Sequence, residues 1–522
     1  MTDRTGRPMD RRLRVRGWLR VQTPLHVGGI ALDPADALPV AVDGQGHVYV
    51  PGTGLAGALR NWMRGTDTRR GALDDLWGFV PDGVANAGNA SRAVLRDAVI
   101  ATSTAFNGYG LPRDPIDPVT LPTRHGVGID RFTGAAASEF LYTRTVVPPG
   151  SYLGFEMDIE STTEHQDEDR RRLAALLAAL SAEEIQLGGA TRRGLGTVSL
   201  LQSPLSVHEH DLTKPSGLLA ILRGRPADAR LETAALPDRR ALLRIRIDWE
   251  PAAPVMVRES GEGPAIGTLP LTTRLNGESL GLTLTGGSIK GALRSHAEFI
   301  ERTARQVCAP NRPAANATPR EHSDSFRDQL DQLPAVRNLF GAGRSRTGGA
   351  AGALTAHECV SRTRIPAKVW KALTDAPPGT DPQERPKLSK DDRKQLNDLG
   401  MDQADHVAID RWTGGASHSR LYSVLEPHAI DWEPINLTVD LTHLGESQDA
   451  ELALLLLVLR DLANRRIPLG GMVTRGFGDI TVLSTTLTGG RWPDGTTLAK
   501  ALEEPQLDEA WKQYLSSTEV NA

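Results

Sequence analysis

The segment Val127-Gly-Ile-Asp-Arg-Phe-Thr-Gly134 recurs later in the chain as Val407-Ala-Ile-Asp-Arg-Trp-Thr-Gly414. Eight residues after its final glycine, each copy is followed by a tyrosine, Tyr142 in the first and Tyr422 in the second. A pattern of this length does not arise twice by chance, so it indicates that a structural unit has been duplicated. The chain has 522 residues, which is enough for two or three domains.

Three more blocks recur in the same order in both halves of the chain. One is a glycine-rich turn that opens a helix, one is a weaker apolar segment with a glycine, and one is a glycine-rich loop that follows a helix and enters a strand. The matching pairs are 54–60 with 288–294, 76–79 with 339–342, and 185–196 with 467–478.

The predicted order of elements within each half indicates the fold class. It is strand, glycine-rich turn, helix, strands, a long insertion, strand, helix, glycine-rich loop and strand, which reduces to βαββαβ. This order favours an antiparallel sheet with two helices on one face. We therefore predict an α+β protein with two tandem modified ferredoxin-like or RRM-like domains, a fold whose open sheet face commonly binds single-stranded RNA.

The repeats also set the expected domain bounds. The polar, mixed stretch between the halves is typical of a linker. Residues 309–326 and 374–400 are rich in charge and proline, and we expect insertions or mobile loops there. The predicted parts are a first domain at 12–205, a linker at 206–240, a second domain at 241–490 and a C-terminal tail at 491–522.

Composition excludes several classes of protein. The chain is 39% hydrophobic and 24% charged, as expected for a folded soluble protein. No apolar run approaches the length of a spanning helix, and the arginine-rich residues 1–20 have no apolar segment like that of a signal peptide, so we expect a cytoplasmic protein with no membrane partner. The two cysteines are too few for a disulfide framework or a four-thiolate zinc site. The net charge of −4 argues against indiscriminate binding of polyanions but permits a local basic groove.

The glycine clusters do not match a nucleotide-binding motif, because the chain has neither a P-loop nor a strand-linked G-x-G-x-x-G. They can instead bring backbone N–H groups close to phosphates, with Arg193 and Arg475 in the same loops adding charge-assisted hydrogen bonds. Lys290 and Arg294 add positive charge where a glycine turn opens a helix. The alternative is a tight loop-to-strand junction with solvated arginines.

Two features of the first half point to chemistry. His26 ends the first strand at the mouth of a glycine-rich turn, where it either acts on a ligand or makes an ordinary backbone hydrogen bond. Asp33 and Asp36 lie in the next loop, where a carboxylate can hold a divalent cation or orient a ribose 2′-OH, or is simply solvated. Aligning the second half on its Leu-Pro dipeptide puts Gly267 in the place of Asp36, so if that acid is catalytic, only one half cuts.

Together these blocks resemble the RAMP superfamily of CRISPR-associated proteins, specifically the Cas-seven-type backbone subunits of type III effector complexes. The matching pieces extend over nearly all of both halves, so the chain resembles a fusion of two backbone domains, as in type III-D-like systems. The pieces in the first half are 25–29, 51–60, 129–134 and 188–196.

The resemblance implies that each domain coats part of a CRISPR guide RNA and carries an inserted thumb hairpin at the Asp-Arg-aromatic-Thr-Gly segment. It also implies cleavage of target RNA with Mg²⁺ or Mn²⁺ by an aspartate of the loop after the first strand. Carried onto this sequence, that catalytic and metal-binding acid is Asp36, with Asp33 as the second choice. The RNA-binding residues would be His26, Arg60, Arg131, Arg192, Arg193, Lys290, Arg294, Arg411 and Arg475.

The expected partners are a guide RNA, a complementary target RNA and the other subunits of an antiviral type III complex. Those subunits are a large polymerase/cyclase-like subunit, other RAMP subunits and a small subunit. Two alternatives to the endonuclease remain at this point: a purely structural guide-binding scaffold, and a standalone guide-processing ribonuclease that uses His26 as a general base without metal.

Overall fold

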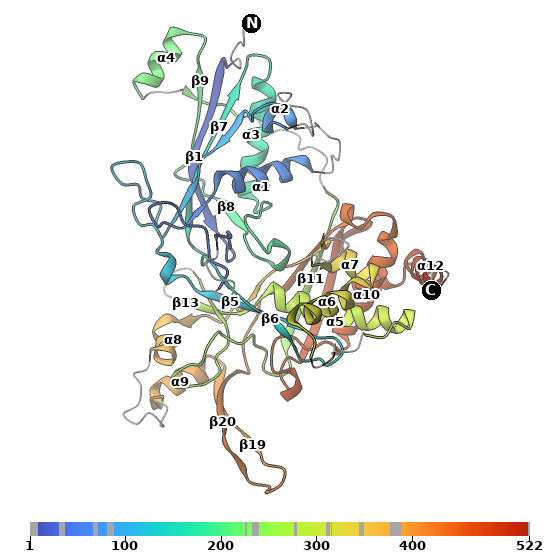
Figure 1. Cartoon of the computed structure of the whole chain (residues 1–522). Coiled ribbons are helices and arrows are strands. Elements are labelled where there is room, and N and C mark those ends of the chain that lie inside the picture. Colours follow the sequence, from blue (N-terminus) through green and yellow to red (C-terminus); the bar gives the residue numbers. More distant parts are fainter. Residues whose placement is uncertain are drawn as a thin grey trace. The chain divides into compact units, whose positions relative to one another are not determined.

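The chain forms two compact units, each with its own sheet and core (Figure 1). In the computed structural model, the first unit comprises 1–123, 144–191 and 195–240, and the second comprises 124–143, 192–194 and 241–522. The residues that the structure describes are 9–30, 37–65, 71, 73–80, 88–224, 227–231, 240–275, 279–309, 314, 316–343, 349–375 and 388–519.

The sheet of the first unit is antiparallel and centred on its first strand. This strand places Leu13 and Val15 on the buried face because successive side chains of a strand alternate between faces. Val15 lies opposite Met157 of its neighbour. The strands are β1 (Arg11–Val21), β2 (Tyr49–Val50), β3 (Ala93–Leu95), β4 (Ala98–Ala101), β7 (Tyr152–Ser161), β8 (Val198–Leu200), β9 (Ser206–Asp211) and β10 (Ala227–Asp228).

Two main helices supply the rest of the first core. In α1 (Gly52–Arg64), Leu55, Leu59 and Met63 recur every four residues and are buried on one face, as an amphipathic helix requires. The shorter helices are α2 (Asp74–Trp77) and α4 (Pro215–Leu222), and the second main helix is α3 (Gln166–Ser181).

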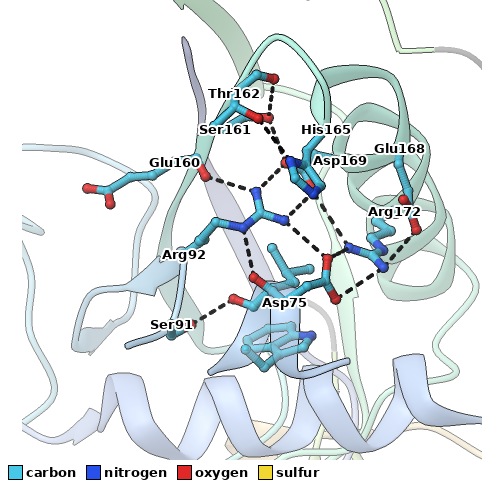
Figure 2. A network of polar contacts seen from close by, with 12 residues as sticks. Asp75, Ser91, Arg92, Glu160, Ser161, Thr162, His165, Glu168, Asp169 and Arg172 are labelled. Atoms are coloured by element: carbon cyan, nitrogen blue, oxygen red, sulfur yellow. Dashed lines mark hydrogen bonds and ion pairs between the residues drawn. The ribbon is translucent and has the colours of Figure 1, made fainter. Parts of the chain in front are cut away.

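A buried ionic network joins these elements in the first unit (Figure 2). Asp169 of α3 is fully buried and accepts from Arg92 Nη1 at 2.5 Å and from Ser161 Oγ at 2.7 Å. Arg172 Nη1 lies 2.6 Å from Asp75 Oδ2, and Arg92 also contacts Asp75. A buried carboxylate is tolerated only when it is paired in this way.

The second unit repeats the plan with a larger core. In β11 (Leu242–Pro251), Leu243, Ile245 and Ile247 alternate with exposed arginines. Its neighbours in the main sheet are β16 (Leu354–Ala356), β21 (Ile435–Asp440), β22 (Ile480–Gly489) and β23 (Trp492–Thr497). Smaller sheets contain β12 (Thr272–Arg274), β13 (Ser279–Leu284), β14 (Gly341–Ala342), β15 (Ala350–Ala351), β17 (Cys359–Val360) and β18 (Ile365–Pro366). The helices are α5 (Gly286–Arg305), α6 (Pro319–Asp331), α7 (Pro334–Phe340), α8 (Ala367–Thr374), α9 (Lys390–Asp398), α10 (Gln448–Ala463), α11 (Leu498–Leu502) and α12 (Pro505–Glu519).

Strand order confirms the predicted fold class. In chain order the four strands of the repeat are β1, β4, β7 and β8 in the first unit and β11, β16, β21 and β22 in the second. Both sheets place them in the spatial order second, third, first, fourth, and all these pairings are antiparallel. This is the ferredoxin-like arrangement that the βαββαβ pattern predicts.

Each half also inserts a long hairpin before its third strand. The first hairpin consists of β5 (Thr123–Ile129) and β6 (Ala136–Thr145), and the second of β19 (Met401–Ile409) and β20 (Ala416–Pro427). Although the first hairpin comes from the first half of the sequence, its residues 124–143 belong to the second unit.

Two segments differ from their sequence-based predictions. The predicted linker at 206–240 contains β9, which pairs with β1 along its full length. The predicted tail at 491–522 contains β23, which pairs with β22, and two helices that bury Leu498, Ala501 and Leu507 in the second core. Both segments are polar overall, but they keep apolar residues on the face that packs.

The predicted insertions are described only in part. Helix α6 covers the end of 309–326 and extends beyond it, and α9 lies in 374–400, whereas 310–313, 315 and 376–387 are outside the described residues. In the part of the chain that the structure describes, no helix is long and apolar enough to cross a membrane.

Candidate nucleic-acid interface

The repeated Asp-Arg-aromatic-Thr-Gly motif forms the tip of each hairpin. Asp130 Oδ1 accepts from the backbone N–H groups of Phe132 at 2.8 Å and Thr133 at 3.0 Å, and Asp410 Oδ1 makes the same two bonds at 2.9 and 2.8 Å. The closing glycine has a φ of 65° in the first tip and 67° in the second, a region that L side chains avoid. The motif is therefore a turn signature that presents an arginine and an aromatic residue at the tip.

A tyrosine–arginine pair joins one strand of each hairpin to a glycine-rich loop. Arg193 Nη1 donates to the Tyr142 hydroxyl, and its guanidinium lies 5.8 Å from the ring centroid. Arg475 Nη1 donates to the Tyr422 hydroxyl at 2.8 Å and lies 5.1 Å from that ring. The sequence identified all four residues but gave no sign that they pair, because each pair is more than fifty residues apart.

The glycine-rich loops are docked against the end of the first strand of each unit. A Cβ at Gly188 would lie 2.2 Å from the carbonyl oxygen of His26, and the Gly189 N–H donates to that oxygen at 2.8 Å. Gly470 and Gly471 have the same relation to Met256. Part of the predicted phosphate cradle is thus already used within the fold, and the arginines remain the groups that can reach an anion.

A group of five cations, the α5 cation cluster, gathers where α5 begins in the second unit. A Cβ at Gly286 would lie 2.5 Å from the carbonyl oxygen of Arg193, so only glycine lets the helix start so close to this loop. This approach brings together residues from the hairpin tip, the loop and the helix. The cluster consists of Arg131, Arg192, Arg193, Lys290 and Arg294.

Lys290 is the buried member of the α5 cation cluster. Its Nζ donates to the carbonyl oxygen of Leu354 at 2.6 Å, and only 8% of the residue is exposed. Burial, followed by the charges of Arg192, Arg294 and Arg193, lowers the pKa of Lys290 to about 7. A nearby anion would favour its protonated form.

Glu298 forms ion pairs with two members of the cluster. Its carboxylate lies 2.5 Å from Arg131 Nε and 2.8 Å from Arg294 Nε, and the residue is almost fully buried. Arg192 lies 3.5 Å from the buried Asp440. Burial lowers the pKa of the Arg294 guanidinium, while Glu298 opposes that effect. The four arginines of the cluster alone outnumber these two carboxylates, which leaves an excess of positive charge, as phosphate binding requires.

The remaining predicted RNA contacts lie apart from this cluster. Arg60 of α1 pairs with Asp74 of α2 at 3.1 Å, and Arg411 is exposed at the tip of the second hairpin. His26 is 6% exposed, its Nδ1 lies 2.8 Å from the carbonyl oxygen of Thr145, and burial lowers its pKa. The geometry of His26 is that of a structural hydrogen bond.

The predicted acids Asp33 and Asp36 lie outside the described residues, but both ends of their loop are described. The Gly29 N–H donates to the carbonyl oxygen of Pro39 at 2.9 Å, which closes the loop at its neck. Beyond the neck, the Thr145 N–H donates to the carbonyl oxygen of Leu38 at 3.0 Å. The loop therefore starts and ends beside the base of the first hairpin, where β6 ends.

The second unit contains the same neck, and its hydrogen bonds correct the sequence alignment by one residue. The Glu259 N–H donates to the carbonyl oxygen of Leu269 at 2.8 Å, so Leu269 matches Pro39. With equal loop lengths, Ile266 rather than Gly267 stands at the position of Asp36. The aligned Leu-Pro dipeptides were misleading because backbone pairing, not residue identity, sets the register. Ile266 is fully buried in the second core.

The predicted loop acids Asp33 and Asp36 would offer carboxylate oxygens, the ligands that Mg²⁺ and Mn²⁺ prefer. Within the described ranges, no three His, Cys, Asp or Glu side chains are arranged to hold a metal ion. Asp36 thus stays a prediction as the metal ligand, with a donor chemistry that fits a hard divalent cation.

Comparison with protein-family models identifies the family of the chain. A family model described as RAMP superfamily matches residues 18–199 and 281–481, well over half of the chain. Each matched region falls in one half and spans that half's repeated blocks. No match is found among curated proteins.

Proposed function

The chain belongs to the RAMP superfamily, and from this membership we propose that it is a backbone subunit of a type III CRISPR effector complex, built as a fusion of two backbone domains. In this proposal it binds a guide RNA and, at the first-half site, cleaves complementary target RNA with a divalent metal ion. Its partners are the guide, the target and the other subunits of the complex, in the cytoplasm.

One observation carries the cleavage proposal. The loop that contains Asp33 and Asp36 has its neck at Gly29 and Pro39 and is bonded through Leu38 to the end of β6. In this proposal, the RNA strand that the hairpin distorts is cut by the acids of the loop whose neck is bonded to the end of β6. This adjacency of neck and hairpin base supports cleavage at the place where the hairpin meets the target strand.

The α5 cation cluster supports RNA binding without sequence readout. Arginines and a lysine around a helix start recognise phosphates through charge and N–H donors, and these contacts carry no base information. The repeated Tyr–Arg pairs supply the same chemistry beside each hairpin. Base pairing between guide and target would then select the sequence, and the protein would read backbone and shape.

The reaction needs little from the protein beyond positioning. An RNA strand that is splayed so that its 2′-OH, phosphorus and leaving 5′-oxygen are in line reacts with modest help. A bound Mg²⁺ or Mn²⁺ supplies charge stabilisation for the phosphate and the leaving oxygen. Asp36 would hold the cation and orient the 2′-OH, and the hairpin would keep the strand extended.

The second half is proposed to bind without cutting. Its counterpart loop has Ile266 buried at the position of Asp36 and Gly263 at the position of Asp33. Neither residue provides an oxygen ligand from its side chain. A metal-independent ribonuclease with His26 as base is disfavoured, because His26 is buried and bonded to a backbone carbonyl.

The test is a cleavage assay on the complex assembled on its guide RNA. An end-labelled complementary RNA is incubated with Mg²⁺, with Mn²⁺ or with EDTA. We expect discrete products only with a metal ion. Binding of the target without any product in either metal would support the alternative of a structural scaffold, and products in EDTA would support metal-independent cleavage.

A further inference from the structure

The α5 cation cluster gathers its charges within a small space. One carboxylate, that of Glu298, contacts both Arg131 and Arg294, with its two oxygens 2.5 and 2.8 Å from their Nε atoms. Burial and the charges of three arginines of the cluster lower the pKa of Lys290, so these groups lie close to its ammonium. The cluster is therefore a concentrated charge and not a row of cations spaced along a strand.

Part of the hydrogen-bonding capacity of the cluster is unused within the described residues. Arg294 donates through Nε to Glu298 and through Nη1 to the carbonyl oxygen of Gly341 at 2.8 Å, but its buried Nη2 has no acceptor in that part of the chain. Lys290 Nζ carries three N–H groups when protonated and donates one of them to Leu354. A charged donor that is buried without an acceptor is costly, and an anion with several oxygens would supply acceptors.

A further cation lies near the glycine-rich loop that carries Arg193. The Nε and Nη1 atoms of Arg124, at the start of β5, are buried and have no acceptor among the described residues. Burial raises the pKa of Glu358, and the charge of Arg124 opposes this effect. Glu358 adjoins the loop, because a Cβ at Gly194 would lie 2.8 Å from its backbone nitrogen. Since burial favours the neutral carboxyl, Glu358 does little to offset the positive charge here.

The charge of the cluster matches a dianion. Its four arginines face the carboxylates of Glu298 and Asp440, an excess of two positive charges to which Lys290 and Arg124 add. A phosphodiester in an RNA strand carries one negative charge. A phosphate monoester carries about −1.5 to −2 near pH 7 and offers three strong acceptor oxygens. A monoester therefore fits both the charge and the unused donors better than a diester does.

We propose that the α5 cation cluster is a binding site for a phosphate monoester, the group at a phosphorylated end of an RNA strand. This inference deepens the proposed RNA binding and rests on it for the molecule that carries the phosphate. The site would fix one end of a bound strand on this chain, whereas contacts with diesters let a strand slide. It would thereby set where the strand begins or ends on the protein.

The main experiment compares three forms of one short RNA with an internal fluorescent label: a 5′-phosphate, a 3′-phosphate, and hydroxyl groups at both ends. Binding to the full chain is measured by fluorescence anisotropy at neutral pH in EDTA. We expect a phosphorylated form to bind about tenfold more tightly than the hydroxyl form. Lys290→Met should remove this advantage. Arg192→Ala, at a less buried position, gives the same test if Lys290→Met does not fold.

Arg475→Ala is the matched control. Arg475 pairs with Tyr422 as Arg193 pairs with Tyr142, but the residue before it is Thr474 and not a second arginine. This variant should weaken binding of all three RNAs by the same factor and keep the advantage of the phosphorylated form. Loss of the advantage in Arg475→Ala as well would overturn the assignment to the α5 cation cluster.

Inorganic phosphate tests the site without RNA and separates the two proposals. Isothermal titration calorimetry should detect phosphate binding to wild type that Lys290→Met abolishes. If phosphate binds in this way but no RNA does, the site is supported with a free phosphate as its ligand, and the proposed function fails. If all three RNAs bind equally well, the proposed function stands and the monoester site is overturned.

Discussion

The loop after β1 and its counterpart after β11 have matching ends and different contents. Both necks are closed by one backbone hydrogen bond, at 2.9 Å in the first and 2.8 Å in the second, and both loops have the same length. Between the ends, the first has Asp33 and Asp36, and the second has Gly263 and the buried Ile266. The two halves share the backbone arrangement at the loop ends. In our proposal, the acids of the first loop distinguish the half that cuts from the half that only binds.

The same contrast appears in the two cores. Asp169 and Glu451 occupy equivalent positions, each eighteen residues before the leucine that bonds the glycine-rich loop. Asp169 is neutralised by Arg92, whereas Glu451 accepts from the neutral groups of Asn338 and Ser447. Burial raises the pKa of Glu451. One buried acid is thus held by an ion pair and the other by neutral hydrogen bonds.

The largest effect is expected from forcing an acid into the second loop. Ile266→Asp places an unpaired carboxylate in the second core and should lower the free energy of unfolding by about 4 kcal/mol or more without creating a new cut. Urea unfolding measures the stability, with Ile266→Val as a control that should cost about 1 kcal/mol. A stable Ile266→Asp protein that gains a cut would show that the loops are interchangeable.

The two buried acids should respond differently to loss of charge. Asp169→Asn removes the fully buried carboxylate of the ion pair with Arg92 and leaves Arg92 with Asp75 alone, so it should cost about 3–5 kcal/mol. Glu451→Gln keeps its neutral partners and should change stability by about 1 kcal/mol or less at pH 7. Thermal unfolding of both variants, followed for each unit's transition, gives the ranking. Equal losses of stability in the two variants would mean that both halves stabilise their buried acid in the same way.

The Tyr–Arg pairs should contribute equally to RNA binding. If each loop contacts one stretch of guide backbone, Arg193→Ala and Arg475→Ala should each weaken binding of single-stranded RNA about tenfold and reduce its salt dependence. Tyr142→Phe and Tyr422→Phe serve as controls, because they remove the hydroxyl acceptor and keep the arginine. An effect confined to one loop would mean that only one half binds guide.

The smallest effect is a pH dependence of RNA binding. The pKa of Lys290 is about 7, so raising the pH from 6 to 8.5 removes its charge and should weaken binding several-fold. Lys290→Met should flatten this profile. The stability of the fold depends on pH in the opposite direction. Between about pH 7 and the ordinary pKa of lysine, the unfolded chain binds more protons than the folded chain. The free energy of unfolding therefore increases as the pH rises through this range. If RNA binding by Lys290→Met depends on pH as it does in the wild type, Lys290 does not contribute to the interface.

The sequence predicted most of the fold, because the repeated blocks mark turns that the backbone requires. Asp130 and Gly134 build a hairpin tip through hydrogen bonds and backbone angles within a few residues, and such an effect is local. Contacts between distant segments were not predictable in the same way. The pairing of Arg193 with Tyr142 and the docking of Arg131 on Glu298 depend on how the first hairpin packs in the second unit.

Two predictions were wrong because they were based on local composition or residue identity and not on how the chain packs. The polar stretch that contains β9 was predicted as a linker, but Val207 packs on the first core while polar residues occupy the rest of the strand. Gly267 was matched to Asp36 by dipeptide identity, and the backbone hydrogen bonds move that match to Ile266. Side-chain chemistry guided the choice of candidate residues, and the paired backbone fixed the register between the two halves.

The most direct test compares Asp33→Ala, Asp36→Ala and wild type, each assembled on guide RNA, on one end-labelled target with Mg²⁺. The account predicts that Asp36→Ala still assembles and binds target but loses one product, by about 100-fold or more in rate, while Asp33→Ala keeps it. An unchanged set of products with both variants would contradict the account and leave the chain as a scaffold.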